Sequence, residues 1–340
     1  MAGERARVLA ATAFGLLALG AAFVVSTAAH DATEPYRQAL VGPLRDAAAS
    51  RGGPAWALWN AVAIWAAEVV LAPDFYLALG VILLLERLRP VHRDQPSLTP
   101  SAAHDFGWFL LQSGVFLPLN GLILVQLDLL YAAYLASWSV SVPAEASAPF
   151  RFVLAVLWSD FLEWSSHVVR HKVPWFWHFH SVHHAQRSLN AFSDTRYHPV
   201  EYQIAQLVRY LPFVLLRVPI PVVIGWGLVA RWYARTYHAN VRLNLGLLRW
   251  VLVTPQSHRV HHSARPEHRD QNFGVILSVW DHLFGTACRD VDVYPETGVQ
   301  DPGFPHERGY ADVLSLRPVA AQLVYPFALI CRSVSGRQRA

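Results

Sequence analysis

The sequence predicts an all-α protein, an integral membrane helical bundle with a cytosolic, histidine-rich helical cap. Three observations predict this architecture. Long apolar stretches recur along the 340 residues, charged residues make up only 15% of the chain, and histidines concentrate in its second half at helical spacing. Globular domains usually contain about 25% charged residues. The sequence has no basic block, so nucleic acid is not an expected partner.

Residues 1–148 are predicted to form N-terminal transmembrane helices. The run 106–127 contains 22 residues without a charge, and about twenty apolar residues suffice to cross a bilayer; a buried core helix of this length is the alternative. Residues 55–86 can form one tilted span, or two shorter spans divided at Pro73 and Asp74. The first 32 residues resemble a signal peptide, but their apolar stretch is long for one, which favours an uncleaved membrane helix.

The arginines predict how these helices are oriented. The connection 87–105 carries three arginines close to a membrane end, and the positive-inside bias places it in the cytoplasm. Arg5 and Arg7 place the N-terminus on the same side. The chain then crosses outward after Asp105 and returns through residues 150–171.

Histidines form three groups with helical spacing. The pattern HxxxH occurs once and HxxHH occurs twice, so each helix turn presents two or three imidazoles on one face. The eight histidines are His167, His171, His180, His183, His184, His258, His261 and His262. Neutral imidazole is a ligand for zinc, copper, iron and nickel. Eight aligned imidazoles exceed the needs of one tetrahedral metal, so the cap is expected to hold a di-metal site. Surface histidines, the alternative, would not explain the repeated phasing.

The region between the second and third groups is predicted to fold as a hairpin. Residues 200–240 are too few for two full membrane crossings, and one crossing would separate the groups. Pro212, Pro219 and Pro221 disfavour a continuous helix. Two short helices that enter and leave from the cytoplasmic side keep both groups together. Residues 172–177, "KVPWFW", are expected to form the turn and aromatic interface anchor between the first two groups.

With these motifs, the sequence resembles the sterol desaturase and fatty acid hydroxylase superfamily of membrane di-iron oxygenases. The resemblance runs from His167 to Thr286 through "HVVRH", "HFHSVHH", "RYHPVE", "YHANVR", "TPQSHRVHH" and "NFGVILSVWDHLFGT". It implies a cytosolic, histidine-ligated di-iron centre in a helical membrane protein. Residues 149–290 are thus predicted to be a fatty acid hydroxylase-like catalytic domain with three histidine boxes. Residues 291–340 would be a C-terminal tail with a membrane-associated helix.

The resemblance also assigns residues to the site. The eight histidines above and His238 match nine metal ligands, while Arg242 stands where some members carry a further histidine. His198 matches a recurring position, where a helix cap, a substrate contact and a ligand all remain open. Asp281 is a candidate to orient a ligand imidazole or to cap a turn. Three more histidines lie outside the boxes and are not expected to bind metal: His178, His268 and His282.

The implied chemistry is oxidation of a membrane lipid with two iron ions and O2 as cosubstrate. The sequence leaves hydroxylation and desaturation open, and also the lipid, which can be a fatty acyl chain, a sterol or a related lipid. It has no GxGxxG motif and no cysteine set for an iron–sulfur cluster; Cys288 and Cys331 are expected to be free thiols. An external reductase or small redox carrier is therefore the expected electron donor.

Two other classes of protein, a zinc-dependent hydrolase and a metal transporter, fit the sequence less well. A zinc-dependent membrane hydrolase usually has three protein ligands and a general-base carboxylate, as in HExxH, and this chain lacks HExxH. A metal transporter would need ionisable groups within its spans rather than clusters at one cytoplasmic end. The oxygenase is favoured over both.

Overall fold

The computed structural model describes residues 73–96, 98–117, 119–120, 130–135 and 146–335. These residues are mainly helical and contain no β-strand, only three isolated bridges, which confirms the all-α prediction. Within this part of the chain, no helix has both the length and the apolar character needed to cross a membrane. The helices expected in residues 1–72 and the uncharged run at 121–129 lie outside the described residues.

The first two histidine boxes lie on consecutive helices, α6 (Ala148–Lys172) and α7 (Pro174–His184). Ser147 caps α6 by accepting the N–H of Phe150. Pro174 disfavours helical geometry at the preceding residue, and only Val173 is extended between the two helices. The expectation that "KVPWFW" forms the turn is therefore wrong, because Pro174–Trp177 is the first turn of α7.

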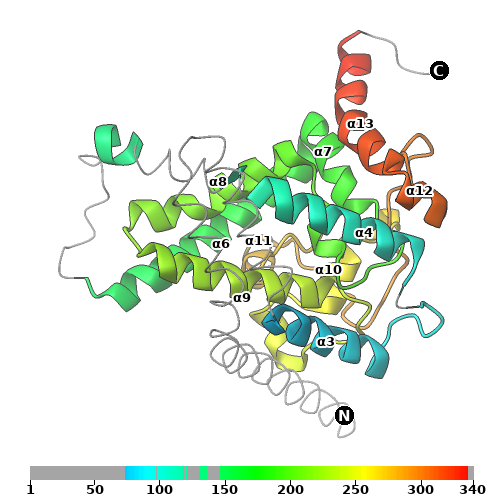
Figure 1. Cartoon of the computed structure of the whole chain (residues 1–340). Coiled ribbons are helices and arrows are strands. Elements are labelled where there is room, and N and C mark those ends of the chain that lie inside the picture. The colour runs from blue at the N-terminus through cyan, green and yellow to red at the C-terminus, as the bar shows by residue number, and fades with distance from the viewer. Residues whose placement is uncertain (1–72, 97, 118, 121–129, 136–145, 336–340) are drawn as a thin grey trace, which may run out of the picture.

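The predicted hairpin is formed by α8 (Pro199–Leu215) and α9 (Ile220–His238). The break falls at residues 216–219, where Arg217 has a left-handed φ of 52°. Pro212 lies inside α8, so it is not the break that the sequence suggested; Pro219 caps α9 instead. Figure 1 shows α6, α8 and α9 lying alongside one another. Phe213 and Val218 pack on Ala155 of α6 in a buried apolar cluster.

The third box lies on the short helix α10 (Pro255–His261), which packs against α9. Thr254 and Ser257 form a capping box that fixes the start of α10. The chain then continues through a long loop, with the 3-10 turn η6 (Pro266–His268), to α11 (Val279–Phe284). This loop runs beside the end of α6, because Lys172 pairs with Asp270 at 2.7 Å.

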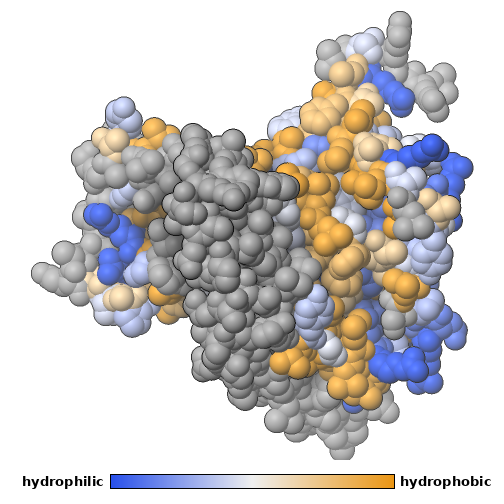
Figure 2. Space-filling view, viewed as in Figure 1, coloured by the Kyte–Doolittle hydropathy of each residue, from blue (hydrophilic) through white to orange (hydrophobic). Residues whose placement is uncertain are grey.

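The remaining helices surround this core. They are α3 (Pro73–Leu88), α4 (Pro100–Leu111), the π-helical turns η1 (Gln112–Phe116) and η2 (Tyr131–Leu135), the 3-10 turns η4 (Ser193–Thr195) and η5 (Gly246–Trp250), α12 (Tyr310–Leu314) and α13 (Arg317–Val334). The proposed division of the second apolar region at Pro73 and Asp74 stays a prediction, because the residues before Pro73 lie outside the described part of the chain. Figure 2 shows apolar side chains gathered in a band on the face formed by α13, α4 and α3.

Asp105 does not mark the polar end of a span, as the sequence suggested. It lies in the middle of α4, is fully buried, and pairs with Arg196 at 2.6 Å. The C-terminal tail contains a helix, α13, and this helix packs on α7. Its association with a membrane stays a prediction.

Candidate metal centre

The structure brings all nine predicted histidines together in two adjacent clusters. In each cluster, one ring nitrogen from every histidine lies within 4.8 Å of the others. The five-histidine cluster contains His167, His171, His180, His184 and His261, and the four-histidine cluster contains His183, His238, His258 and His262. The two clusters touch, since the rings of His184 and His262 stack with centroids 4.4 Å apart.

Each HxxHH box is divided between the clusters. Side chains four residues apart on an α-helix differ by about 40° in direction, whereas those three apart differ by about 60° the other way. His180 and His184 therefore enter the five-histidine cluster while His183 enters the other. The third box is divided in the opposite sense, with His261 crossing to the five-histidine cluster. The boxes thus interleave, which was not predicted.

Most of these imidazoles are fixed by a hydrogen bond from Nδ1. His167, His183, His238 and His261 meet backbone carbonyl oxygens at 2.7 to 3.2 Å, and His180 meets a carboxylate oxygen of Glu201 at 2.5 Å. A proton on Nδ1 leaves Nε2 with a lone pair, the arrangement typical of metal-bound histidine.

The facing nitrogens fit metal ions. The Nε2 atom of His180 lies 3.1 Å from that of His167 and 3.1 Å from that of His184. In the other cluster, Nε2 of His258 lies 2.8 Å from that of His238. Nδ1 of His167 and Nδ1 of His180 both meet an oxygen acceptor, so their Nε2 lone pairs face each other and repel unless a cation lies between them. The Nε2 atoms of His171 and His261 are also buried without a partner, which is unusual for a polar atom. The donor set therefore fits two metal ions.

Burial keeps these imidazoles neutral. It lowers the pKa of all nine, to about 4 for His238 and well below the usual range for seven others. His171 is lowered less, because Asp270 opposes the effect of burial. Metal binding needs the neutral ring, so at neutral pH these nitrogens are ready to coordinate an ion.

Glu201 is a site residue that the sequence reading missed. It is completely buried in the first turn of α8, where it contacts His180 and pairs with Arg170 at 3.4 Å. A carboxylate in this position orients the imidazole and raises its basicity as a ligand. A signal was available, because Glu201 follows His198 by three residues in "RYHPVE", the spacing of a residue in the first helical turn after a cap.

His198 lies outside both clusters and caps α8. Its Nδ1 accepts the N–H of Val200 at 3.2 Å, and its Nε2 donates to the carbonyl of Leu323 at 3.0 Å. Of the three roles left open, the helix cap is the one this geometry fits. Arg242 also lies away from the clusters and stacks over the ring of Tyr294.

Asp281 acts on the site through the backbone rather than through a ring N–H. Its carboxylate accepts the N–H groups of Phe273 and Gly274, both at 2.8 Å, and the indole N–H of Trp164 at 3.0 Å. The carbonyl of Phe273 in turn accepts from His167. Asp281 therefore fixes the loop at Phe273 and Gly274, and the carbonyl of Phe273 in this loop orients His167.

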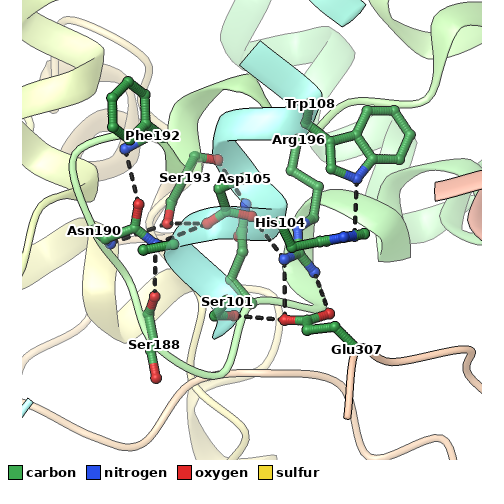
Figure 3. A network of polar contacts seen from close by, with 12 residues as sticks. Ser101, His104, Asp105, Trp108, Ser188, Asn190, Phe192, Ser193, Arg196 and Glu307 are labelled. Carbon is green, nitrogen blue, oxygen red and sulfur yellow. Dashed lines mark hydrogen bonds and ion pairs between the residues drawn. The ribbon is translucent and has the colours of Figure 1, made fainter. Parts of the chain in front are cut away.

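A buried ion-pair network contacts the four-histidine cluster through Arg196. The carbonyl of Arg196 accepts from His183, while its guanidinium lies between Asp105 and Glu307 (Figure 3). Asn190 and Ser193 donate to the same carboxylate of Asp105. The network joins α4, the loop after the second box and the C-terminal segment.

The three histidines that were not expected to bind metal, His178, His268 and His282, lie outside the two clusters. His282 is exposed and lies against Trp250, with ring centroids 4.6 Å apart. His268 is buried near Cys288 and Asp290, and one ligand atom from each of these three lies within 4.8 Å of the others. Cys288 and Cys331 are free thiols, as predicted.

Two cavities reach the clusters. The loop-side cavity, about 330 Å³, is lined by His171, His184 and His261 and by loop residues 263–265, 269–270 and 298–301. The helix-side cavity, about 70 Å³, lies between α6, α8 and α9 and is lined by His167 of one cluster and by His183, His238 and His258 of the other.

Comparison with known proteins agrees with the arrangement of the boxes. Residues 152–286, which carry all nine histidines, match the family model for fatty acid hydroxylase. This region belongs to the sterol desaturase and fatty acid hydroxylase superfamily. No solved structure matches the chain.

Curated relatives of this chain have names that describe lipid hydroxylases and monooxygenases. The chain is 27% identical to ornithine lipid hydroxylase OlsE of Rhizobium tropici, over 61% of this chain and 63% of that protein. It is 28% identical to alkylglycerol monooxygenase of Danio rerio, over 64% of this chain and 46% of that protein. The human alkylglycerol monooxygenase is 30% identical over 41% of this chain. The matches thus cover less than two thirds of these relatives' lengths.

Proposed function

We propose that the protein is an O2-dependent di-iron oxygenase that hydroxylates a C–H bond of a membrane lipid. The observation that carries this proposal is the pair of adjacent histidine clusters, in which ring nitrogens face one another at 2.8 to 3.1 Å. Nine imidazoles are more than the three protein ligands of a hydrolytic zinc site. The names of the relatives, hydroxylase and monooxygenase, favour hydroxylation over desaturation.

In this proposal the iron ions supply the chemistry and the chain supplies the environment. Two iron ions, when bound, would use O2 and two electrons to oxidise an unactivated C–H bond. One oxygen atom enters the alcohol and the other leaves as water, with two protons taken up. The buried imidazoles stay neutral and fixed by their Nδ1 partners, and the surrounding helices exclude water from the reacting carbon.

The two electrons would come from a separate reductase or small redox carrier. The sequence contains no nucleotide-binding GxGxxG motif and no cysteine set for an iron–sulfur cluster. The loop-side cavity is the wider of the two described above and opens beside Arg265 and Arg269. We therefore propose that the carrier binds on this side.

We also propose that the protein is integral to a membrane and that its metal centre faces the cytoplasm. The arginines of residues 87–105 support this orientation. Phe150 and Val153, in the half of α6 remote from the histidines, are more than half exposed. Reporter fusions after His184 and after His262 should both report the cytoplasm, and opposite sides would contradict this part of the proposal.

Isotope labelling tests the reaction. A strain that lacks the gene and its parent are grown under labelled O2, and their lipids are compared by mass spectrometry. The parent should contain a lipid with one labelled hydroxyl oxygen, and the deletion strain should accumulate the same lipid without it. An unlabelled product, or purified zinc protein that is active without O2, would overturn the proposal.

A further inference from the structure

Besides the histidines, polar side chains line part of the helix-side cavity and form what we call the polar wall. These side chains are Gln112, Tyr202, Gln206, Arg209 and Arg231, which line the cavity together with residues of both clusters. A site built only for the middle of an acyl chain would be lined by apolar side chains. The polar wall indicates that a polar part of the substrate lies here, close to the metal ions.

Three arginines line this cavity, and one of them lacks an acidic partner. Arg170 pairs with Glu201 at 3.4 Å, and Arg209 pairs with Glu163 at 2.5 Å. Arg231 instead donates to two neutral groups, the amide oxygen of Gln112 at 2.9 Å and the hydroxyl of Tyr202 at 3.4 Å. Among the described residues, no carboxylate lies within ion-pair distance of Arg231. Asp194 also acts on Arg231 electrostatically, but its carboxylate pairs with Arg235 at 3.0 Å. An anion from outside the chain would therefore give Arg231 the direct ion pair that it lacks.

The same wall also offers an acceptor without a donor. The amide oxygen of Gln206 is buried and has no hydrogen-bond partner, and the residue is only 4% exposed. Unsatisfied buried acceptors are rare in folded proteins. A substrate O–H or N–H group would satisfy this oxygen. The wall therefore complements a ligand that carries both an anion and a hydrogen-bond donor.

The helix-side cavity joins the polar wall to the metal centre. This small space, about 70 Å³, is lined by Arg231 and Gln206 as well as by histidines of both clusters. A headgroup bound to the polar wall would therefore place a neighbouring carbon atom close to the metal ions.

We propose that the helix-side cavity binds the headgroup of the substrate lipid, with an anionic group on Arg231 and an N–H or O–H donor on Gln206. This inference rests on the proposed function. It narrows the substrate to an anionic lipid with a hydrogen-bond donor in its headgroup, and it places the oxidised carbon in or next to the headgroup. A carboxylate and a phosphate offer Arg231 the same chemistry.

Two matched probe pairs test the proposal and distinguish the two anions. The first pair is N-oleoyl-glycine, which carries a carboxylate and an amide N–H, and its neutral methyl ester, and the second is oleoyl lysophosphatidic acid and monooleoylglycerol. Binding of each probe to the full-length, iron-loaded protein in nanodiscs is measured by calorimetry. Wild-type protein should bind the anionic member of at least one pair about tenfold or more tightly than its neutral counterpart.

Substitutions assign the preference to the cavity. Arg231→Gln should reduce it to less than about twofold, and Arg231→Lys should keep part of it, because a lysine retains the charge but not the fork geometry. Arg332→Gln, on the exposed surface of α13, is the matched control and should leave the preference intact. Gln206→Leu should weaken binding of the donor-bearing probes without removing the anion preference.

The outcomes separate this inference from the proposed function. Equal binding of the anionic and neutral members of both pairs by wild-type protein would overturn it, and this comparison needs no variant to fold. A preserved preference in a folded Arg231→Gln protein would also overturn it. Oxidation of a neutral lipid with no anion preference would leave the oxygenase standing and remove only the headgroup site.

Discussion

At the scale of single residues, the partner of each imidazole is as informative as the imidazole itself. His261 lies in the five-histidine cluster with Nε2 buried and unpaired, and its Nδ1 donates to the carbonyl of Gln271 at 2.9 Å. His282 belongs to the same stretch of sequence but lies outside both clusters and is exposed. The two residues therefore form a matched pair for testing the ligand assignment.

Replacing His261 with alanine should abolish turnover and lower the bound iron from about two ions to about one per chain. No neighbouring side chain can take its position, because the other four imidazoles of the cluster are already used. His282→Ala should keep both ions and most of the activity. Metal analysis and turnover of the purified variants check both statements, and equal losses would refute the ligand assignment.

Glu201→Gln should weaken metal binding by about 10- to 100-fold, the usual effect of removing such an outer partner. The amide can still accept the N–H of His180, but it removes the negative charge that raises the basicity of the ring. Metal affinity is measured by competition with a chelator. The control is Glu296→Gln, whose carboxylate is 79% exposed. If both variants bind metal as the wild type does, Glu201 has no such role.

At the scale of elements, the helices carry the histidine ligands, and backbone carbonyls of the loops fix the orientation of their rings. The segment between α10 and α11 provides the carbonyl of Phe273 for His167 and that of Gln271 for His261. Asp281 fixes this segment through two backbone N–H groups. Gly274 allows the close approach, since an added Cβ would lie 2.8 Å from the carbonyl of Leu277 and 2.9 Å from the carboxylate of Asp281.

Gly274→Ala should destabilise the protein by about 1–3 kcal/mol, as overpacking does, and should reduce bound iron by displacing the Phe273 carbonyl. Gly225→Ala is the matched control, because an added Cβ there meets nothing within 4 Å in the interior of α9. It should be neutral or stabilise by up to about 1 kcal/mol. Thermal unfolding and metal analysis decide, and a Gly274→Ala protein as stable as wild type would contradict the account.

The contrast between helices that carry ligands and loops that position them also explains what could be predicted from the sequence. Helical spacing identified eight of the nine clustered histidines, because periodicity is a local property. The family resemblance added His238, and the length and prolines of residues 200–240 predicted the hairpin of α8 and α9. Helical spacing did not reveal that His183 and His261 cross to the other cluster, since that depends on how α7 and α10 face each other. Glu201 and the carbonyl partners were missed for the same reason. Asp105 was misplaced because a buried ion pair with Arg196 is indistinguishable from a polar helix end in sequence.

At the scale of the whole molecule, the centre couples metal binding to folding. Burying nine neutral imidazoles lowers their pKa values below the ordinary value of 6.5, to about 4 for His238. Below pH 6.5 the unfolded chain binds protons that the folded chain does not. The free energy of unfolding must therefore fall as the pH falls.

The metal-free protein should accordingly keep a constant denaturant midpoint between about pH 7 and 8 and lose stability steadily from about pH 6.5 to 4. The iron-loaded protein should resist this loss, because bound metal competes with protons for the same nitrogens. Denaturant titrations of both forms at each pH provide the comparison. A metal-free protein equally stable at pH 7.5 and pH 5 would show that the imidazoles are not buried as described.

Mössbauer spectroscopy, together with metal analysis of the purified full-length protein, tests the central claim most directly. The account predicts two iron ions per chain that form one magnetically coupled pair, held by the five- and four-histidine clusters. Active protein that contains zinc, or only isolated single iron ions, would contradict it.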